Sequence, residues 1–179
     1  MKLALNCEKN LYKDPLCDAM QRDLVALVRT PEFAFELPLL SDSSWNLICH
    51  DHKERERLEF LGDALISASI SRELFRCQPD ETPDFYTVRS SNFFPSLSNV
   101  RFRMQKARSV LTANSTFAHL MHKLGFHNLD NPVKPAGDAY ETILAVFHGE
   151  NGPDDFAEYM RRFFTPLINT VGDTYRRLR

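Results

Sequence analysis

The apolar positions of the chain recur at intervals of three and four residues, the spacing expected of amphipathic helices. This pattern predicts helices over about 15–29, 52–76, 98–111, 114–124 and 135–148, and two more after Pro153 and Pro166. A shorter helix or turn is predicted to open at Thr30. No alternation typical of a β-strand extends over any length, and no internal repeat occurs. The predicted fold class is therefore all-α.

Residues that favour helix ends mark several of these boundaries. Asp14 stands before a proline, which is typical of a helix start, and Asn114 is predicted to cap the helix that follows it. The run Ser-Asp-Ser-Ser over 41–44 indicates a turn. Gly149 and Gly152 are predicted to end a helix whose sides are apolar almost all round. That apolar helix is therefore predicted to be central and buried.

The helix predicted over 52–76 carries three acids on one stripe. Glu56, Glu59 and Asp63 are spaced three and four residues apart, so their carboxylates lie above one another and repel. A second stripe, predicted to face the core, consists of Leu58, Leu61 and Leu65. An acidic stripe alone is more often a solvated face than a site. The repulsion nevertheless favours a cation bound over these acids.

A second pair of acids stands on the apolar helix. Asp138 and Glu141 are three residues apart and so share one face. If the two acidic faces meet, Glu59 and Asp63 approach this pair, and each pair of carboxylates 4 Å apart repels by about 4 kcal/mol at an effective dielectric near 20. A bound dication would remove this repulsion. Oxygen ligands alone favour magnesium, manganese or calcium, and magnesium is typical of phosphodiester hydrolysis.

Length and composition fit one globular domain with a substantial core, since the chain has 179 residues of which 43% are hydrophobic. A formal net charge of -2 and a pI near 6.3 exclude a uniformly basic chain, so contacts with nucleic acid must come from local patches. The four cysteines are widely separated, which favours free thiols in a reducing compartment. No signal peptide or membrane span is indicated. We therefore expect an intracellular protein of cytoplasm or nucleus, with no membrane partner and no small-molecule cofactor.

The acidic helix resembles the signature helix of the ribonuclease III family. The matching run is Glu56-Arg57-Leu58-Glu59-Phe60-Leu61-Gly62-Asp63-Ala64, without a gap. The run Lys134-Pro135-Ala136-Gly137-Asp138-Ala139-Tyr140-Glu141 is similar to the family's second acidic motif. Between them, Arg108-Ser109-Val110-Leu111-Thr112-Ala113-Asn114 is similar to a third run of the family. Lys134 and Gly137 are closer to the Dicer-type branch, so the resemblance is to a divergent, eukaryotic type.

The resemblance implies a single ribonuclease III domain over 1–179, with N-terminal helices (1–50), a catalytic core (51–152) and C-terminal helices (153–179). It implies a homodimer in which a metal site lies at each end of a valley for RNA. The implied metal ligands are Glu59, Asp63, Asp138 and Glu141. Glu56 would be an auxiliary acid, and Lys134 a phosphate or acid partner. Phe60 would be a contact of the dimer interface.

The expected activity is magnesium-dependent hydrolysis of RNA to 5'-phosphate and 3'-hydroxyl ends, with Mn²⁺ as the alternative ion, in RNA processing or RNA silencing. Double-stranded RNA is the family's substrate. The segment near 85–98 looks like an insertion that would change the groove, so single-stranded RNA is an alternative. We expect no double-stranded-RNA-binding domain within these 179 residues. A non-catalytic RNA-binding or scaffold domain is the alternative function. Retention of every acid favours the enzyme.

A basic run before the third motif is a candidate RNA contact. It consists of Arg101, Arg103, Lys106 and Arg108. Spaced positive charges of this kind can follow a phosphate backbone. A plain amphipathic helix explains the same run equally well, and the sequence does not decide between these interpretations.

Overall fold

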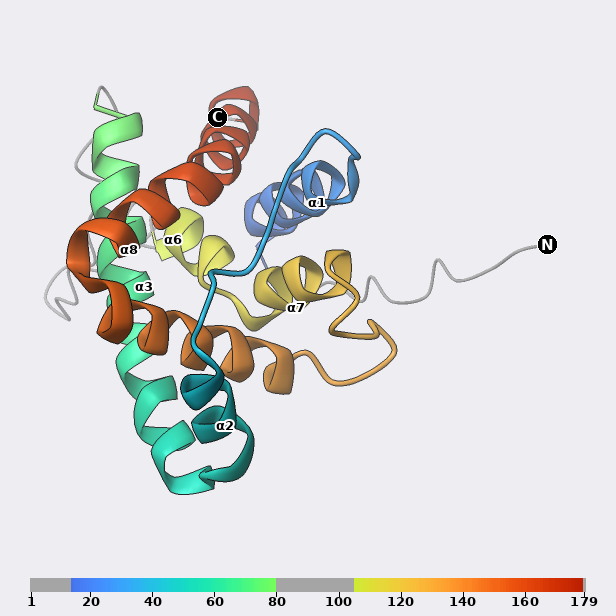
Figure 1. Cartoon of the computed structure of the whole chain (residues 1–179). Coiled ribbons are helices and arrows are strands. Elements are labelled where there is room, and N and C mark those ends of the chain that lie inside the picture. Colours follow the sequence, from blue (N-terminus) through green and yellow to red (C-terminus); the bar gives the residue numbers. More distant parts are fainter. Residues whose placement is uncertain (1–13, 80–104, 179) are drawn as a thin grey trace, which may run out of the picture.

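The computed structural model describes residues 14–79 and 105–178 (Figure 1). The helices in these ranges are α1 (Pro15–Arg29), α2 (Asp42–His50), α3 (His52–Cys77), α6 (Gln105–Leu111), α7 (Asn114–Lys123) and α8 (Lys134–Leu178). The two ranges contain no strand, so the all-α prediction is confirmed. No helix among the described residues has the apolar length that crossing a bilayer requires.

Helix α8 organises the packing of the domain. Its largest interface is with α3, and α1 and α7 also pack against it. Tyr140 and Leu144 of α8 are fully buried and meet Phe117 of α7 and Met20 of α1 in one hydrophobic core. The first part of α8 is therefore the central, buried helix that its apolar sides predicted.

The course of α8 differs in part from the prediction. The helical backbone is interrupted at Gly152, where φ is 85° and ψ is 177°, but not at Gly149. Pro153 then lies in the first turn of the second part, where a missing N–H costs nothing. The predicted break at Pro166 is wrong, because the helix continues through it. Phe164 and Leu167 on either side are fully buried, and this packing outweighs the lost backbone hydrogen bond.

The prediction of a short helix or turn opening at Thr30 is confirmed as a turn, which lies at Pro31 and Glu32. After this turn the chain runs without helix from Phe33 to α2 and passes in front of the first part of α8 (Figure 1). Phe33 and Phe35 are both buried, because side chains two residues apart in an extended strand-like segment share one face. The Tyr159 hydroxyl donates to the Glu36 carbonyl at 3.0 Å and fixes this segment against α8.

Two helix starts lie elsewhere than predicted. The run 41–44 is the start of α2 and not a free turn: the Ser41 side chain accepts from the backbone N–H of the third residue after it. Glu150 of α8 accepts from the Ser41 hydroxyl at 2.5 Å and holds this start in place. For α7 the cap residue is Ala113, and Asn114 is the first residue inside the helix.

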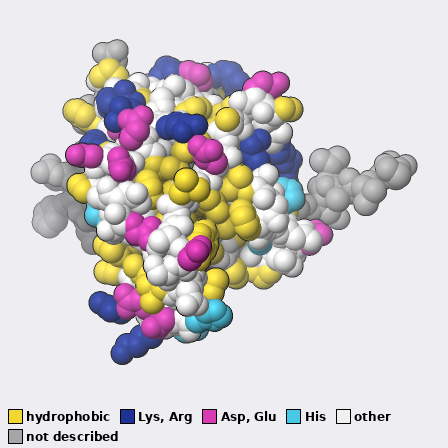
Figure 2. Space-filling model, in the orientation of Figure 1, with side chains coloured by type: hydrophobic (Ala, Val, Ile, Leu, Met, Phe, Trp, Pro, Cys, Tyr) yellow, Lys and Arg dark blue, Asp and Glu magenta, His cyan; other side chains and the backbone are white. Residues whose placement is uncertain are grey.

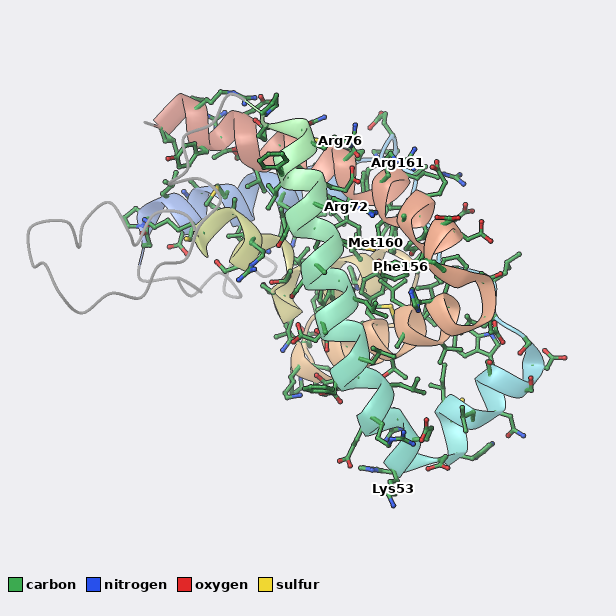
Figure 3. The ribbon with its side chains drawn as sticks, turned by 90° about the vertical axis from the view of Figure 1, so that its left-hand side faces the viewer. Lys53, Arg72, Arg76, Phe156, Met160 and Arg161 are labelled. Carbon is green, nitrogen blue, oxygen red and sulfur yellow. The ribbon has the colours of Figure 1, made fainter. Side chains whose placement is uncertain are left out.

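The faces of α3 are also reassigned. Leu61, predicted to face the core, is 44% exposed. The face that packs against the rest of the domain carries Gly62, Ile66 and Ile70, all buried. Glu59 lies on the same side of the helix as this face, because Gly62, Ile66 and Ile70 follow it by three, seven and eleven residues. The acidic stripe therefore borders the packed face of α3, and Figure 3 shows α3 crossing in front of α8.

Candidate active site

Helix α3 crosses α8 in direct backbone contact at Gly62. A Cβ added to Gly62 would lie 2.0 Å from the backbone oxygen of Glu141, so this approach requires glycine. The contact places Glu59 and Asp63, on either side of the glycine, next to the first turns of α8, where Asp138 stands. Gly62 was not predicted to have a role of its own, although a glycine inside a strongly helical pattern often marks a close approach.

Three of the four predicted metal ligands come together at this crossing. Oxygens of Glu59, Asp138 and Glu141 all lie within 4.8 Å of one another. Asp63 lies outside this closest group but lines the same cleft, whose volume is about 810 Å³. The donors are all carboxylate oxygens, which suits a hard divalent cation such as Mg²⁺ or Mn²⁺. The residues therefore fit the metal ion that the sequence predicts.

Lys134, the first residue of α8, brings an ammonium group to these acids. Its Nζ donates to both carboxylate oxygens of Asp138, at 2.6 and 2.7 Å, and lies 3.4 Å from Oε1 of Glu59. The hydrogen bond with Asp138 is the largest cause of a raised pKa of Lys134, so the side chain is held as a cation. Lys134 was predicted to be a partner of a phosphate or of an acid, and in this structure its partners are acids.

Glu141 is the acid most affected by this environment. Its side chain is buried, and its pKa is raised from 4.5 to about 7. Burial is the largest cause, followed by the negative charges of the neighbouring acids, while the charge of Lys134 acts in the opposite direction. Glu141 is therefore the group in this cleft that would gain most from a bound cation.

Glu141 should make the metal-free protein less stable as the pH rises from about 4.5 to about 7. In that interval the unfolded chain has released the Glu141 proton and the folded chain still holds it, so the free energy of unfolding falls by about 3 kcal/mol across the window. Urea denaturation with chelator at pH 5 and pH 8 measures the effect. Glu141→Gln should lack it.

The comparison of the two proteins also removes the contribution of His119. Burial lowers the pKa of His119 to about 4, which makes stability rise with pH over part of the same range. Parallel pH profiles for the wild type and Glu141→Gln would contradict the placement of Glu141 in a repulsive acid cluster.

Two further residues of the signature helix, Glu56 and Phe60, also line the cleft. Glu56 lines it and is exposed, with its Oε1 3.7 Å from Nδ1 of His52. Phe60 lines the same cleft and is 80% exposed. A large aromatic side chain so exposed contributes little to the packing of its own chain and is suited to contact a partner.

Asn114, the last residue of the third run similar to the family and a predicted helix cap, is also a residue of the cleft. It lies at the start of α7, lines the cleft, and packs so closely on Gly137 that a Cβ there would lie 2.1 Å from its Oδ1. Gly137 precedes Asp138 in the first turn of α8. The contact therefore fixes the first turn of α8, and with it Asp138, against α7. Helix α7 thus forms the third wall of the cleft, beside α3 and α8.

The predicted basic run is only partly described. Arg101 and Arg103 lie outside the described residues. Lys106 is buried and forms an ion pair with Asp14, and burial lowers its pKa. Arg108 is half-buried. Lys106 thus acts as a tie between α6 and the start of α1. On the face shown in Figure 2, basic and acidic side chains of the described residues are interspersed.

The chain is similar to bacterial proteins named Ribonuclease 3. It is 31% identical over 119 residues to that of Mycolicibacterium smegmatis, covering 65% of this chain and 49% of that protein. The protein of Mycobacterium bovis is 30% identical over 119 residues (65% and 47%), and that of Listeria welshimeri 25% over 129 residues (65% and 48%). The chain spans about half the length of these relatives. No protein-family model matches it, and no solved structure gives a significant match.

Proposed function

Because the chain belongs to the ribonuclease III family, as its two acidic motifs predicted, we propose that it is an endoribonuclease that uses a divalent metal ion, Mg²⁺ or alternatively Mn²⁺. The products would carry 5'-phosphate and 3'-hydroxyl ends. The observation that carries the proposal is the convergence of the two motifs, since Glu59 comes from the first and Asp138 and Glu141 from the second. Acids more than seventy residues apart in the sequence share one open cleft.

Each acid has a distinct part in this function. Glu59, Asp138 and Glu141 would hold the ion, with Asp63 completing the set from the turn of α3 beside Gly62. When bound, the ion would activate a water molecule and stabilise the charge that builds on the phosphate. Glu56, which lines the cleft at its exposed rim, would be an auxiliary acid near the scissile phosphate.

We propose RNA as the substrate, with double-stranded RNA as the family expectation and single-stranded RNA as the alternative. The cleft is open and polar on the side of the acids, as a site for a phosphodiester backbone must be. The pathway, RNA processing or RNA silencing, and the place, cytoplasm or nucleus, stay predictions from the sequence.

Cleavage of end-labelled RNA tests the proposal. One RNA sequence is offered in single-stranded and double-stranded form, with Mg²⁺ and with chelator. Cutting that requires the ion and leaves 5'-phosphates is the expected result, and the preferred strand state then identifies the substrate. If neither form is cut although RNA is bound, the non-catalytic RNA-binding alternative replaces the enzyme.

We further propose that the protein is a homodimer with Phe60 in its interface. Phe60→Ala should weaken dimerisation by about tenfold or more, because truncation of an aromatic anchor commonly costs about 2 kcal/mol of binding free energy. The fold should survive, since the ring is 80% exposed in the single chain. Analytical ultracentrifugation over a range of concentrations measures the change.

Phe126→Ala is the matched control for Phe60→Ala. Phe126 is also highly exposed, at 67%, but lies in the loop after α7. The proposed interface is wrong if both variants, or neither, change the sedimentation of the protein.

A further inference from the structure

The Lys134 ammonium lies among the acids of the proposed metal site. Its Nζ is not merely near the acids: it bridges Asp138 on α8 and Glu59 on α3. These are two of the three acids whose oxygens form the closest group in the cleft. The lone pairs that Lys134 uses are therefore among those that a metal ion would need.

The charge balance of the metal-free cleft depends on this side chain. Glu59, Asp138 and Asp63 surround Glu141 with negative charge, and Lys134 is the group whose charge lowers the pKa of Glu141 against them. A cation bridging two helices also joins α3 to the start of α8. In the absence of metal, Lys134 thus does part of what a bound ion would do.

A divalent ion and the bridging ammonium would compete for these oxygens. Metal–oxygen bonds of about 2.1 Å would bring the two cations within direct repulsion of each other across the same carboxylates. Lys134 can yield, because its side chain is 66% exposed and its four-carbon stem is flexible. Its contact with Asp138 spans one helical turn, so rotation of the stem breaks it without any change in the backbone.

We propose that Lys134 is a displaceable internal counter-ion, which occupies the cation position at Asp138 and Glu59 in the metal-free protein and withdraws from these acids when a metal ion binds. The ammonium is then released at the rim of the cleft, next to the substrate. This role rests on the proposed function, because it presupposes that the acids hold a divalent ion. Lys134 is here a positioning residue that sets metal affinity, in addition to any contact with RNA.

Metal affinity provides the test. Isothermal titration calorimetry with Mg²⁺, and separately with Mn²⁺, is performed on the full chain and on Lys134→Met, whose side chain has similar length and no charge. If the ammonium vacates the site about one-tenth of the time, removing it should tighten metal binding about tenfold. Equal or weaker binding by Lys134→Met would overturn the proposal.

Lys53→Met controls for the loss of a positive charge as such. Lys53 is exposed on the first turn of α3, outside the residues that line the cleft, and Figure 3 places it at the end of that helix. Its replacement should change metal affinity by less than about twofold, since solvent and salt screen exposed charges. If metal affinity rises by a similar factor in both variants, then the effect comes from the loss of one positive charge anywhere on the surface, which would count against displacement.

A second measurement follows the wild-type protein itself and needs the variant only to assign one resonance. The ¹⁵Nζ resonance of Lys134, assigned by its loss in Lys134→Met, should shift when Mg²⁺ saturates the site. An unchanged resonance at saturation overturns the proposal. Failure of the wild type and of Lys134→Met to bind either metal would remove the metal site of the proposed function as well. If the wild type binds metal and cleaves RNA, but Lys134→Met does not bind metal more tightly, then only the displacement of Lys134 is wrong and the proposed function stands.

Discussion

Asp138→Ala is expected to slow RNA cleavage by about a thousandfold or more, because the loss of a proposed metal ligand would remove several kcal/mol of transition-state stabilisation. Asp138 belongs to the closest acid group and stands beside the crossing of α3 and α8. No other acid on the first turns of α8 can replace it, since Glu141 already belongs to the same group. Cleavage under single-turnover conditions with Mg²⁺ measures the effect.

The same variant should fold and dimerise normally. Asp138 is half-buried at the cleft and its ion pair with Lys134 is solvent-exposed, so the free energy of unfolding should change by less than about 1 kcal/mol. Asp63→Ala should behave alike, because Asp63 is exposed and lines the cleft. Asp154→Ala, an exposed acid of α8 outside the cleft, is the control that should cleave like wild type. Comparable cleavage by Asp138→Ala and Asp154→Ala would remove the proposed metal site.

Local signals predicted most of the helices. The Asp14 cap and its following proline are the start of α1, and the apolar sides of the 135–148 segment correctly indicated a central helix. These features depend on residues close in sequence, where capping and periodicity act directly. Helical spacing placed each pair of acids on one face, whereas the meeting of the two pairs was implied by the resemblance to the ribonuclease III family.

Features decided by tertiary packing were not predictable in the same way. Pro166 should end a helix on local grounds, yet buried side chains on both sides carry α8 through it. Leu61 reads as a core residue by spacing, but it faces outward because the acidic stripe borders the face that α8 covers. The pattern shows two faces of α3 and does not say which of them the rest of the chain will cover.

The close contacts that shape the site were the hardest to foresee. Gly62 and Gly137 are each required by a neighbour distant in sequence, the backbone of Glu141 for the first and the side chain of Asn114 for the second. A glycine in a helical pattern signals a close approach without identifying what approaches. Only the packed structure shows that both glycines serve the same cleft.

Gly62→Ala is expected to destabilise the protein although alanine is the better helix former. Helix propensity alone would stabilise the variant by about 1 kcal/mol. The new Cβ, however, would lie 2.0 Å from the backbone oxygen of Glu141 and 2.6 Å from its carbonyl carbon, and backbone atoms of a buried helix cannot rotate away. Helices α3 and α8 must separate, and we expect the free energy of unfolding to fall by about 3 kcal/mol.

Urea denaturation of Gly62→Ala and Gly149→Ala separates packing from propensity. Gly149 lies in α8, and a Cβ there would meet nothing within 4 Å, so alanine should leave stability unchanged or raise it slightly. Separation of the helices also draws Glu59 away from Asp138 and Glu141, so Gly62→Ala should bind metal more weakly even where it remains folded. If Gly62→Ala were as stable as Gly149→Ala and bound metal like wild type, then the backbone contact at Gly62 would not be what holds the two acidic motifs together.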